Sequence, residues 1–357
     1  MRRFFKELWC TRVHGMGELR ITIKEIAKEL GLSHSTVSRV LNDKQGVLIS
    51  EPTRARILET AARMDYRPNR LAQALQGTTT NLIGILLPGG HDYFFNQVEH
   101  VLRSLVERDG YELLPFAVSG GHVRESWHRL LSWDMDGIFV FDYLLHIDGL
   151  WEALEGHNGA IPPMIGLFGS SSKMRDFVTF DFRPGMRELL NHFISQGAAS
   201  IGYMAPAPSF QRDEQRYAAY LDYMSEFRMA VDNLHVRPSD DLSEGARLGM
   251  FDHLDKGRPL PDALFCQNDE IALGAYRALH ERGIKVPDSV LLAGCDDIPY
   301  VGYLEQPLTT LSLPVDAACH DAWRFLKQRM ESRGGDPLRS ILEVSLKVRS
   351  SSRRSHL

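Results

Sequence analysis

Polar and basic side chains follow one another between residues 33 and 42, in an order that suits contacts with nucleic acid. The guanidinium of Arg39 offers the two donors that pair with O6 and N7 of a guanine. His34 and Ser35 lie about one helical turn before it, at the end of a helix that meets base edges in the major groove. Thr36, Ser38 and Asn42 are short polar residues that suit phosphate oxygens. This pattern predicts a helix that reads DNA.

Two short helices joined by a tight turn would position these side chains. Thr22 and Glu25 have the spacing of a capping box, and the apolar residues that follow recur at helical spacing. Gly31 would end this first helix in the left-handed conformation that glycine adopts readily. Ser33 would then cap the second helix. The sequence therefore predicts that the cap of the second helix comes only two residues after the glycine that ends the first.

A third helix would close the core of this segment. Ser50 and Pro52 open it, and Ile57, Ala61 and Met64 give it an apolar stripe. Two helices with a glycine-containing turn and a third helix packed on them form a helix-turn-helix arrangement. The alternative is a three-helix bundle with no role in DNA binding.

The run from Thr22 to Asn42 closely resembles the signature of the lactose-repressor (LacI/GalR) family, and residues 66–77 resemble the hinge segment of that family. The resemblance implies that His34 and Ser35 select the DNA half-site, assisted by Arg39. It also implies a homodimer that binds a near-palindromic operator in double-stranded DNA. The DNA-binding residues are then Thr22, Ser33, His34, Ser35, Thr36, Ser38, Arg39, Asn42, Tyr66, Asn69, Arg70, Ala72 and Leu75.

The hinge segment is predicted to be a short helix from Arg70 to about Leu75, capped by Asn69 and ended by Gly77. A helix of fewer than two turns is marginal in water, so it should order only when it is held. The resemblance implies that it pairs with its dimer mate in the minor groove, where Leu75 inserts between base pairs. An ordinary linker is the alternative.

After residue 80, apolar runs alternate with segments of helical periodicity. Continuous apolar strands between helices predict a parallel sheet covered on both faces, and the alternation restarts after residue 181. Strands are expected at 82–87, 111–118, 137–141, 164–168, 178–180, 200–204, 263–266 and 290–294, and helices at 94–107, 125–131, 150–154, 185–196, 213–227, 242–254 and 270–282. The fold class is therefore α/β: a helix-turn-helix domain followed by a sensor domain with two lobes and parallel sheets.

This second part resembles the sensor domain of the same family, which is similar to periplasmic binding proteins. The resemblance places Arg216, Asn268 and Asp296 where family members contact a small-molecule effector, and their donors and acceptors suit sugar hydroxyls. Each has a structural alternative: a surface ion pair for Arg216, a helix cap for Asn268 and a turn for Asp296. Phe168 stands where sugar-binding members carry an acidic residue. Phe94 would add an aromatic surface to the site, with lobe core as its alternative.

The resemblance favours a sugar or sugar derivative as the effector, while a purine, an acid or a protein partner remains open. It leaves open whether the effector releases the operator or strengthens binding to it. No cofactor and no metal ion are expected. We expect a dimer, because residues 350–357 lack the heptad pattern of a tetramerising tail.

Charge is distributed unevenly along the 357 residues, whose formal net charge is −5. Residues 20–77 contain ten Lys and Arg against six Asp and Glu, and the residues that follow are net acidic. A basic segment joined to an acidic body is typical of a DNA-binding module attached to a soluble domain. The sequence has no apolar run long enough to span a membrane and no signal peptide, so we expect a cytoplasmic, nucleoid-associated protein.

Four cysteines without metal-ligand spacing are expected to be free thiols. We expect residues 1–19 to be an extension, with Met16 as the native start. The expected domains are then a helix-turn-helix domain at 20–66, a hinge and linker at 67–80, an effector-binding and dimerisation domain at 81–350 and a polar tail at 351–357.

Two rival functions find little support in the sequence. An α/β enzyme would be expected to carry a phosphate-binding glycine loop, a dinucleotide-binding fingerprint or a hydrolase elbow, and none of these motifs occurs. A periplasmic binding protein would lack the helix-turn-helix. We therefore expect a non-enzymatic regulator of transcription, most simply a repressor.

Overall fold

The computed structural model describes residues 21–41, 49–66, 80–88, 93–118, 123–141, 161–169, 174–212 and 214–354. Contacts within the chain separate two compact units, Met1–Thr78 and Thr79–Leu357, which we call the head and the sensor. Several sequence predictions lie outside the described residues: the extension at 1–19, the helix at 150–154, Asn42, Asn69, Arg70, Ala72 and Leu75.

The described part of the head contains three helices, α2 (Ile23–Leu30), α3 (His34–Leu41) and α4 (Glu51–Arg63). The capping box forms, since the backbone N–H of Thr22 donates to Glu25 Oε2 at 2.7 Å. Gly31 ends α2 with a φ of +66°, as the sequence predicts. Ile26, Val37 and Ile57, one from each helix, are completely buried. The helix-turn-helix arrangement is therefore confirmed.

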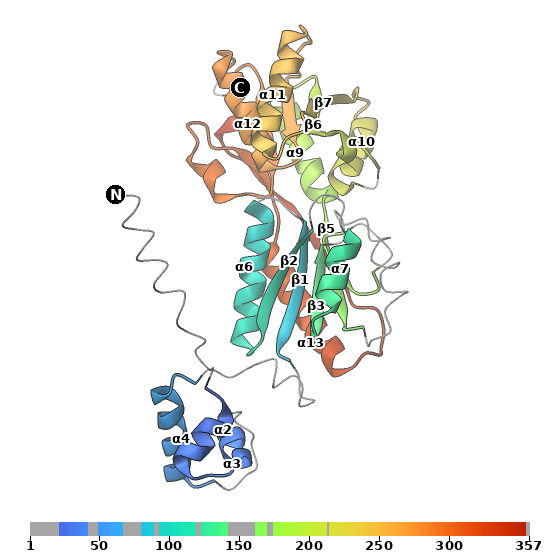
Figure 1. Cartoon of the computed structure of the whole chain (residues 1–357). Coiled ribbons are helices and arrows are strands. Elements are labelled where there is room, and N and C mark those ends of the chain that lie inside the picture. Colours follow the sequence, from blue (N-terminus) through green and yellow to red (C-terminus); the bar gives the residue numbers. More distant parts are fainter. Residues whose placement is uncertain are drawn as a thin grey trace, which may run out of the picture. The chain divides into compact units, whose positions relative to one another are not determined.

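The sensor begins with a lobe built on a six-stranded sheet, which we call the N-lobe. Its strands lie in the order β11-β5-β4-β3-β1-β2, and all described pairings between them are parallel. Figure 1 shows α6 and α7 on either side of this sheet. The elements are β1 (Leu82–Pro88), α6 (Tyr93–Arg108), β2 (Glu112–Val118), α7 (Val123–Leu131), β3 (Gly137–Phe141), β4 (Met164–Leu167), β5 (Phe177–Asp181), α13 (Val315–Glu331) and β11 (Arg339–Glu343).

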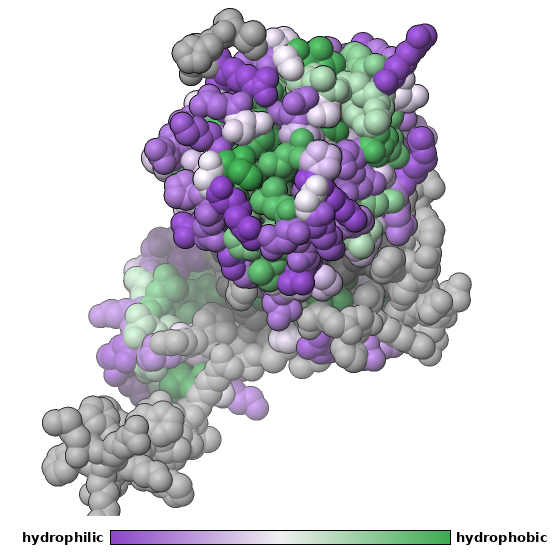
Figure 2. All heavy atoms as spheres, turned by 90° about the horizontal axis from the view of Figure 1, so that it is seen from above, coloured by the Kyte–Doolittle hydropathy of each residue, from purple (hydrophilic) through white to green (hydrophobic). Residues whose placement is uncertain are grey.

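The second lobe, the C-lobe, has a six-stranded sheet in the order β12-β10-β9-β8-β6-β7. Among the described strand pairings of this lobe, the pairing of β12 with β10 is antiparallel and the others are parallel. Viewed from the end of this lobe, the surface shows apolar residues gathered inside a hydrophilic rim (Figure 2). The elements are α9 (Arg183–Ser195), β6 (Ile201–Pro206), η1 (Ala207–Ser209), α10 (Gln215–Glu226), β7 (Asp232–Val236), α11 (Leu242–Asp255), β8 (Ala263–Cys266), α12 (Asp269–Glu281), β9 (Leu291–Cys295), η2 (Pro299–Tyr303), β10 (Thr309–Ser312), β12 (Ser345–Lys347) and η3 (Ser350–Ser352).

The α/β alternation and the two parallel sheets are confirmed, and most predicted bounds shift by one or two residues. Five elements of the structure were not predicted from the sequence: β7, β10, α13, β11 and β12. β11 and β12 are short and half-exposed, so neither forms the apolar run that reveals a buried strand. In α13 the helical apolar spacing was present but was not assigned.

Residues 351–354 belong to the C-lobe rather than to a separate polar tail. Ser351 and Ser352 are completely buried. The Ser351 hydroxyl donates to the carbonyl oxygen of Leu292 at 2.6 Å and accepts the N–H of Thr309 at 2.8 Å. Because Ser351 satisfies buried backbone groups, polar residue types alone gave the wrong expectation here.

None of the described helices has both the length and the apolar character that a membrane-spanning helix requires.

Candidate functional site

The exposed side of α3 carries the residues predicted to read DNA. His34, Ser35 and Arg39 are exposed, while Val37 and Val40 pack into the core of the head. The helix is thus anchored by its apolar residues, and its polar residues remain on the surface. This division of roles is what a recognition helix requires, because a side chain must leave the protein core to reach a base edge.

Hydroxyl groups meet at the start of α3. Ser33 Oγ accepts the backbone N–H of Thr36 at 3.1 Å, so it caps the helix as the sequence predicts. The same oxygen lies 2.8 Å from Ser35 Oγ and 2.8 Å from Thr36 Oγ1. These contacts fix the orientation of the hydroxyls at the end of the helix that carries His34. Ser38 is half-buried on the same helix.

Tyr66 follows α4 and belongs to the head by its contacts. Its side chain packs against the apolar core of the head, and its N–H donates to the carbonyl oxygen of Ala61 at 2.9 Å. The predicted hinge that starts beyond it lies outside the described residues. Thr22 is exposed at the N-cap of α2.

In the sensor, the five candidate effector residues each lie beyond the carboxyl end of a parallel strand. Phe94 follows β1 and Phe168 follows β4 in the N-lobe. In the C-lobe, Arg216 follows β6, Asn268 follows β8 and Asp296 follows β9. Ligands of open α/β sheets bind at this edge, where the strands end and the loops begin. We call these five residues the interlobe site.

Two of them have an unusual backbone conformation. Phe168 has a φ of +60° and Asp296 a φ of +106°, and Asp297 follows with +56°. Positive φ is costly for residues with a Cβ and above all for a bulky one, and it is found most often at functional sites. The strain sets the directions in which the side chains leave the ends of β4 and β9.

Charged groups of the interlobe site are buried beside one another. Arg216 and Asp296 are 7% and 6% exposed, and Arg216 Nη2 lies 3.5 Å from Asp296 Oδ1. A second carboxylate, that of Glu214, lies 3.9 Å from Arg216 Nη1. The guanidinium also stacks over the ring of Phe182, 5.0 Å from its centroid. Polar groups of a ligand can replace one partner of such a buried ion pair, and the other partner then stays shielded from bulk water.

Aromatic rings form the N-lobe side of the site. Phe168 stacks on Phe180 with their centroids 4.6 Å apart and an interplanar angle of 10°. Phe94 and Phe141 each lie 5.5 Å from Phe168. Phe94 and Phe168 are both buried, at 5% and 7% exposure. The aromatic surface that the sequence predicts near Phe94 is thus part of a packed cluster.

Asn268 serves as the N-cap of α12. Its Oδ1 accepts the N–H of Ile271 at 2.9 Å, and its side chain is 8% exposed. This contact is the structural alternative considered for Asn268. Its oxygen is therefore engaged within the protein, which leaves the amide NH₂ as the group with which a ligand could interact.

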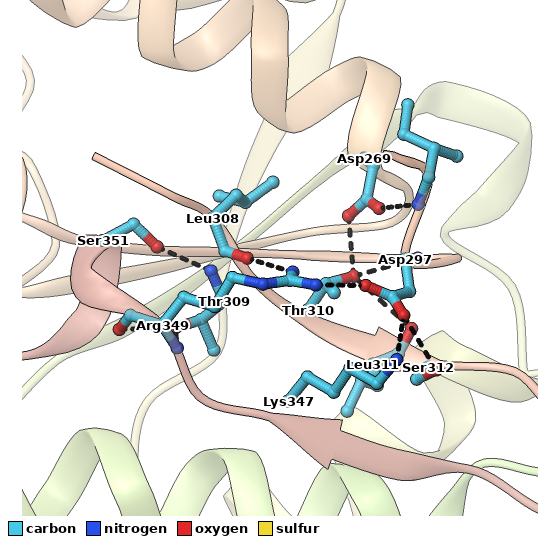
Figure 3. A network of polar contacts seen from close by, with 11 residues as sticks. Asp269, Asp297, Leu308, Thr309, Thr310, Leu311, Ser312, Lys347, Arg349 and Ser351 are labelled. Atoms are coloured by element: carbon cyan, nitrogen blue, oxygen red, sulfur yellow. Dashed lines mark hydrogen bonds and ion pairs between the residues drawn. The ribbon is translucent and has the colours of Figure 1, made fainter. Parts of the chain in front are cut away.

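Asp269, the next residue, was not predicted from the sequence, although it forms the buried end of a polar network (Figure 3). Its carboxylate is completely buried and accepts from Thr310 Oγ1 at 2.7 Å and from the N–H of Ile298 at 2.9 Å. Burial and the nearby carboxylate of Asp296 raise the pKa of Asp269 well above its usual value. A Cβ at Gly294 would collide with Asp269 Oδ1, so only glycine fits there.

Asp297 forms the outer half of the same network. It contacts Lys347 and Arg349 from the C-terminal segment, and Ser312 Oγ donates to its Oδ2 at 3.1 Å (Figure 3). Burial tends to raise the pKa of Asp297, but the two cations outweigh that effect and lower it. The network thus ties the strained turn after β9 to β10 and β12. The only sequence signal for it was the run of acidic residues after β8 and β9.

The two lobes also meet at Tyr93, the first residue of α6. Its N–H donates to Glu270 Oε1 at 3.2 Å, and its ring lies edge-on to Tyr300 with centroids 5.4 Å apart. Glu270 and Tyr300 belong to the C-lobe. This contact joins the lobes beside Phe94 and Asn268, so a relative movement of the lobes would alter it.

The described residues contain no group of His, Cys, Asp and Glu side chains arranged to hold a metal ion. The described cysteines, Cys266, Cys295 and Cys319, are free and buried.

Comparison with known proteins matches both units. Residues 22–69 match the model of bacterial regulatory proteins of the lacI family, and residues 190–352 match a periplasmic binding protein-like domain. The chain belongs to the LacI family. The regulator therefore combines the DNA-binding domain of that family with a sensor of periplasmic-binding-protein type, as the sequence resemblance implies.

Similar proteins share this organisation over most of their length. The HTH-type transcriptional repressor PurR of Vibrio campbellii is 28% identical over 314 residues, which cover 87% of this chain and 92% of that protein. The HTH-type transcriptional regulator AscG of Escherichia coli is 26% identical over 300 residues, covering 82% and 87%. The lac repressor dimer bound to operator and the anti-inducer ONPF has a TM-score of 0.79 at 23% identity, covering 94% and 99%, and this likeness concerns the fold.

Proposed function

We propose that this LacI-family regulator is a repressor that binds a near-palindromic operator as a homodimer and changes its affinity for that operator when a small molecule binds the interlobe site. The relatives are transcriptional regulators, so we also propose that the protein has no catalytic role. Its place of action would be chromosomal DNA in the bacterial cytoplasm.

The observation that carries the DNA-binding proposal is the arrangement of α3. His34, Ser35 and Arg39 are exposed on a helix whose opposite side is anchored by Val37 and Val40, and the family match covers this segment. A recognition helix of about two turns reads only a few base pairs, so a single head would bind weakly. Two heads on a palindrome double the number of contacts and require a dimer.

The hinge supplies the second part of this proposal. Asn69, Arg70, Ala72 and Leu75 are proposed to contact the minor groove, with Leu75 as the residue that inserts between base pairs. The supporting observation is the match to the family model, which extends to residue 69 and ends inside this segment. We expect Leu75→Ala to lose most of the operator affinity while the unfolding transition of the sensor stays unchanged.

The proposal is tested by mixing the full chain with random double-stranded DNA and selecting the duplexes that it binds. We expect an enriched site with two inverted half-sites, and a complex that contains two protein chains when its mass is measured. Binding should weaken steeply as salt concentration rises, because phosphate contacts release counterions. Enrichment of an asymmetric site, or of no site at all, would contradict the proposal.

Variants of α3 decide whether this helix reads the bases. We expect the double variant His34→Ala/Ser35→Ala to select a different or degenerate half-site, since these side chains are proposed to contact base edges. Glu59→Ala provides the control, because Glu59 is exposed on α4 and faces away from the packed core. If the double variant selects the same half-site as the unaltered protein, another element reads the operator.

For the effector we propose a sugar or sugar derivative. Arg216 donates, Asp296 accepts and the amide of Asn268 donates, which together suit neighbouring hydroxyl groups. The stacked rings of Phe168 and Phe180 suit the apolar face of a sugar ring. A purine would use the same rings for stacking, and an acid would use Arg216 alone, so both are outcomes to be distinguished.

A thermal-shift screen with sugars, sugar acids, nucleobases and nucleosides identifies the class. A ligand at about a hundred times its dissociation constant stabilises the folded state by about 2.7 kcal/mol, which gives an easily measured shift. We expect the shift to disappear in Asp296→Asn, and the operator affinity to change in the presence of the ligand. A screen without a hit would favour a protein partner as the signal.

A further inference from the structure

A pocket of about 610 Å³ lies at the point where β5 leaves the N-lobe and α9 begins the C-lobe. It is lined by β5, β11 and the first turns of α9 and α10. We call it the edge pocket, because β11 is the edge strand of its sheet. None of the five residues of the interlobe site lines it. Its volume is within the range of small-molecule sites.

Positive charge dominates the edge pocket. Among its described lining residues, Arg183, Arg212 and Arg339 are cationic and Asp181 is the one carboxylate. The described lining therefore carries a formal surplus of two positive charges. Asp181 Oδ1 accepts the backbone N–H of Arg183 at 3.0 Å, so part of the carboxylate is already committed to the start of α9.

Two of the three guanidinium groups are available to a ligand. Arg212 lies 3.5 Å from Asp222 in an exposed ion pair. Within the described ranges, Arg183 and Arg339 form no ion pair with a carboxylate, and Arg339 lies over the ring of Phe177 at 5.5 Å. Guanidinium groups bind the oxygens of phosphate and carboxylate with two parallel hydrogen bonds, which favours them at anion sites.

Apolar side chains lie beside these charges. Ile341 is 64% exposed, and the half-buried Phe177 lies on the paired strand β5, opposite Arg339. Arg339 and Ile341 are two residues apart on β11, so their side chains leave the same face of the strand. An exposed isoleucine beside an arginine on one wall of a pocket suits a ligand with an organic part and a charged group.

We propose that the edge pocket binds a phosphate monoester of about the size of a sugar phosphate. Such a group carries a charge of about −1.5 to −2 at pH 7, which matches the surplus of two positive charges. Its three terminal oxygens accept hydrogen bonds from Arg183 and Arg339, and its organic part covers Ile341 and Phe177. This site is separate from the effector site proposed above and does not depend on it.

Binding of a ligand in the edge pocket would also affect the interlobe site. Gln215 lines the pocket and donates to Thr179 Oγ1 at 3.1 Å, which joins α10 of the C-lobe to β5 of the N-lobe. Arg216 is the next residue on α10. Phe182 lines the pocket, and the guanidinium of Arg216 stacks over its ring. Because coupling between two sites is reciprocal, an effector in the interlobe site would change the affinity of the edge pocket by the same factor.

Titration calorimetry of the full chain with glucose 6-phosphate tests the proposal, with glucose and inorganic phosphate as companion probes. We expect saturable binding of glucose 6-phosphate, weaker binding of inorganic phosphate and none of glucose at this site. We expect the affinity to fall as salt concentration rises, since the arginines are exposed and their charges are screened.

Two independent variants localise the binding. The double variant Arg183→Gln/Arg339→Gln removes both guanidinium groups and should weaken glucose 6-phosphate binding at least tenfold. Ala218→Trp leaves the charges in place but fills the pocket from the half-exposed side of α10, and should weaken binding to a similar extent. Arg258→Gln is the matched control, because Arg258 is an exposed arginine outside the pocket.

Several results would overturn the proposal. One is the absence of saturable binding of both glucose 6-phosphate and inorganic phosphate. Another is equal binding of glucose and glucose 6-phosphate. A third is binding that survives both pocket variants but is lost in Arg39→Ala or Asp296→Asn, which would place the anion on the basic head or in the interlobe site.

Discussion

The head and the sensor divide structural and functional roles in opposite ways. In the head, the proposed DNA-reading side chains His34, Ser35 and Arg39 are exposed, and the fold is held by other residues of the same helices. In the sensor, Arg216 and Asp296 are buried against each other and Asn268 caps a helix. His34, Ser35 and Arg39 can therefore change at little cost to the fold of the head, whereas changes at Arg216, Asp296 or Asn268 remove contacts that hold the sensor together.

This difference has a physical cause. Operator DNA is a large ligand that remains outside the protein, so its contacts are made by side chains on a convex surface. A small effector must be surrounded, and the groups that bind it are then buried even before it arrives. Buried polar groups need partners, so they form contacts with one another. Variants of the two regions can test whether the contrast is real.

The largest effect is expected for Asp296→Ala. Removing this carboxylate takes away a buried ion-pair partner of Arg216, whose other described carboxylate contact, with Glu214, is longer at 3.9 Å. Loss of one partner from a buried ion pair destabilises a protein by about 3 kcal/mol. Chemical denaturation followed by tryptophan fluorescence would measure the change in the free energy of unfolding of the sensor.

Asp296→Asn is the matched control, because it keeps the shape of the side chain and part of its hydrogen bonding. It should lose clearly less stability than Asp296→Ala. Equal stability of Asp296→Ala and the unaltered protein would show that the Arg216–Asp296 contact has no structural role. The contrast between the two regions would then fail at its main point.

The second effect concerns Asp269, whose raised pKa predicts a pH dependence. A carboxyl group with a raised pKa binds a proton more tightly in the folded than in the unfolded state. Its contribution to stability is therefore present below the unfolded pKa and is lost as pH rises through the folded pKa. We expect the stability of the unaltered protein, relative to Asp269→Asn, to decline as pH rises from about 4.

Asp269→Asn fits the site, because the hydroxyl of Thr310 can reverse its hydrogen bond and accept from the amide of the asparagine. Asp269→Asn should therefore stay within about 1 kcal/mol of the unaltered protein at pH 7, while Asp269→Ala leaves the N–H of Ile298 unpaired and should cost about 2 kcal/mol. Denaturation curves of the three proteins between pH 4 and pH 8 measure both effects. Parallel pH profiles for all three would show that Asp269 keeps an ordinary pKa.

Arg39→Ala should change function without changing stability. Loss of a bidentate contact with a guanine weakens operator binding by about 1–3 kcal/mol, or roughly tenfold or more. The free energy of unfolding should stay within about 0.5 kcal/mol, since the side chain is exposed. Arg63→Ala is the control, because Arg63 is exposed in the same unit and pairs with Glu29 at 3.0 Å. Equal losses of affinity in both variants would reduce the role of Arg39 to that of a surface charge.

The same contrast explains what the sequence could and could not predict. The helices of the head are short and local, and their caps and apolar spacing are visible within a few residues, as Thr22, Glu25 and Gly31 show. The strands β1 to β6 were also predictable, because each is an apolar run. The fold class and the family resemblance needed only these local patterns.

Long-range partners could not be predicted. The pairing of β11 with β5 joins residues that are more than 150 positions apart, and the burial of Ser351 depends on a carbonyl oxygen from β9. The contact between Asp269 and Thr310 also joins residues that are far apart in sequence, 41 positions from each other. The resemblance placed Arg216 and Asp296 at one site, but only the structure shows that they contact each other.

The smallest effect is expected at the capping box of the head. Glu25→Ala removes the acceptor of the Thr22 N–H, and the loss of such a cap contact costs about 0.5–1 kcal/mol. Glu29→Ala on the same helix also removes a carboxylate but only breaks an exposed ion pair with Arg63, so it should cost less. The measurement is the unfolding of the head, followed by circular dichroism at helix wavelengths.

An effect of this size is informative because the core of the head is small. Six buried apolar residues form that core in the described part of the unit, so its total stability is low and a loss below 1 kcal/mol lowers the population of folded head measurably. Operator affinity should then fall by the same small factor, because only the folded head binds. If Glu25→Ala reduces affinity without reducing the stability of the head, this residue acts on DNA directly, and even the simple division between structural and reading residues in the head would need revision.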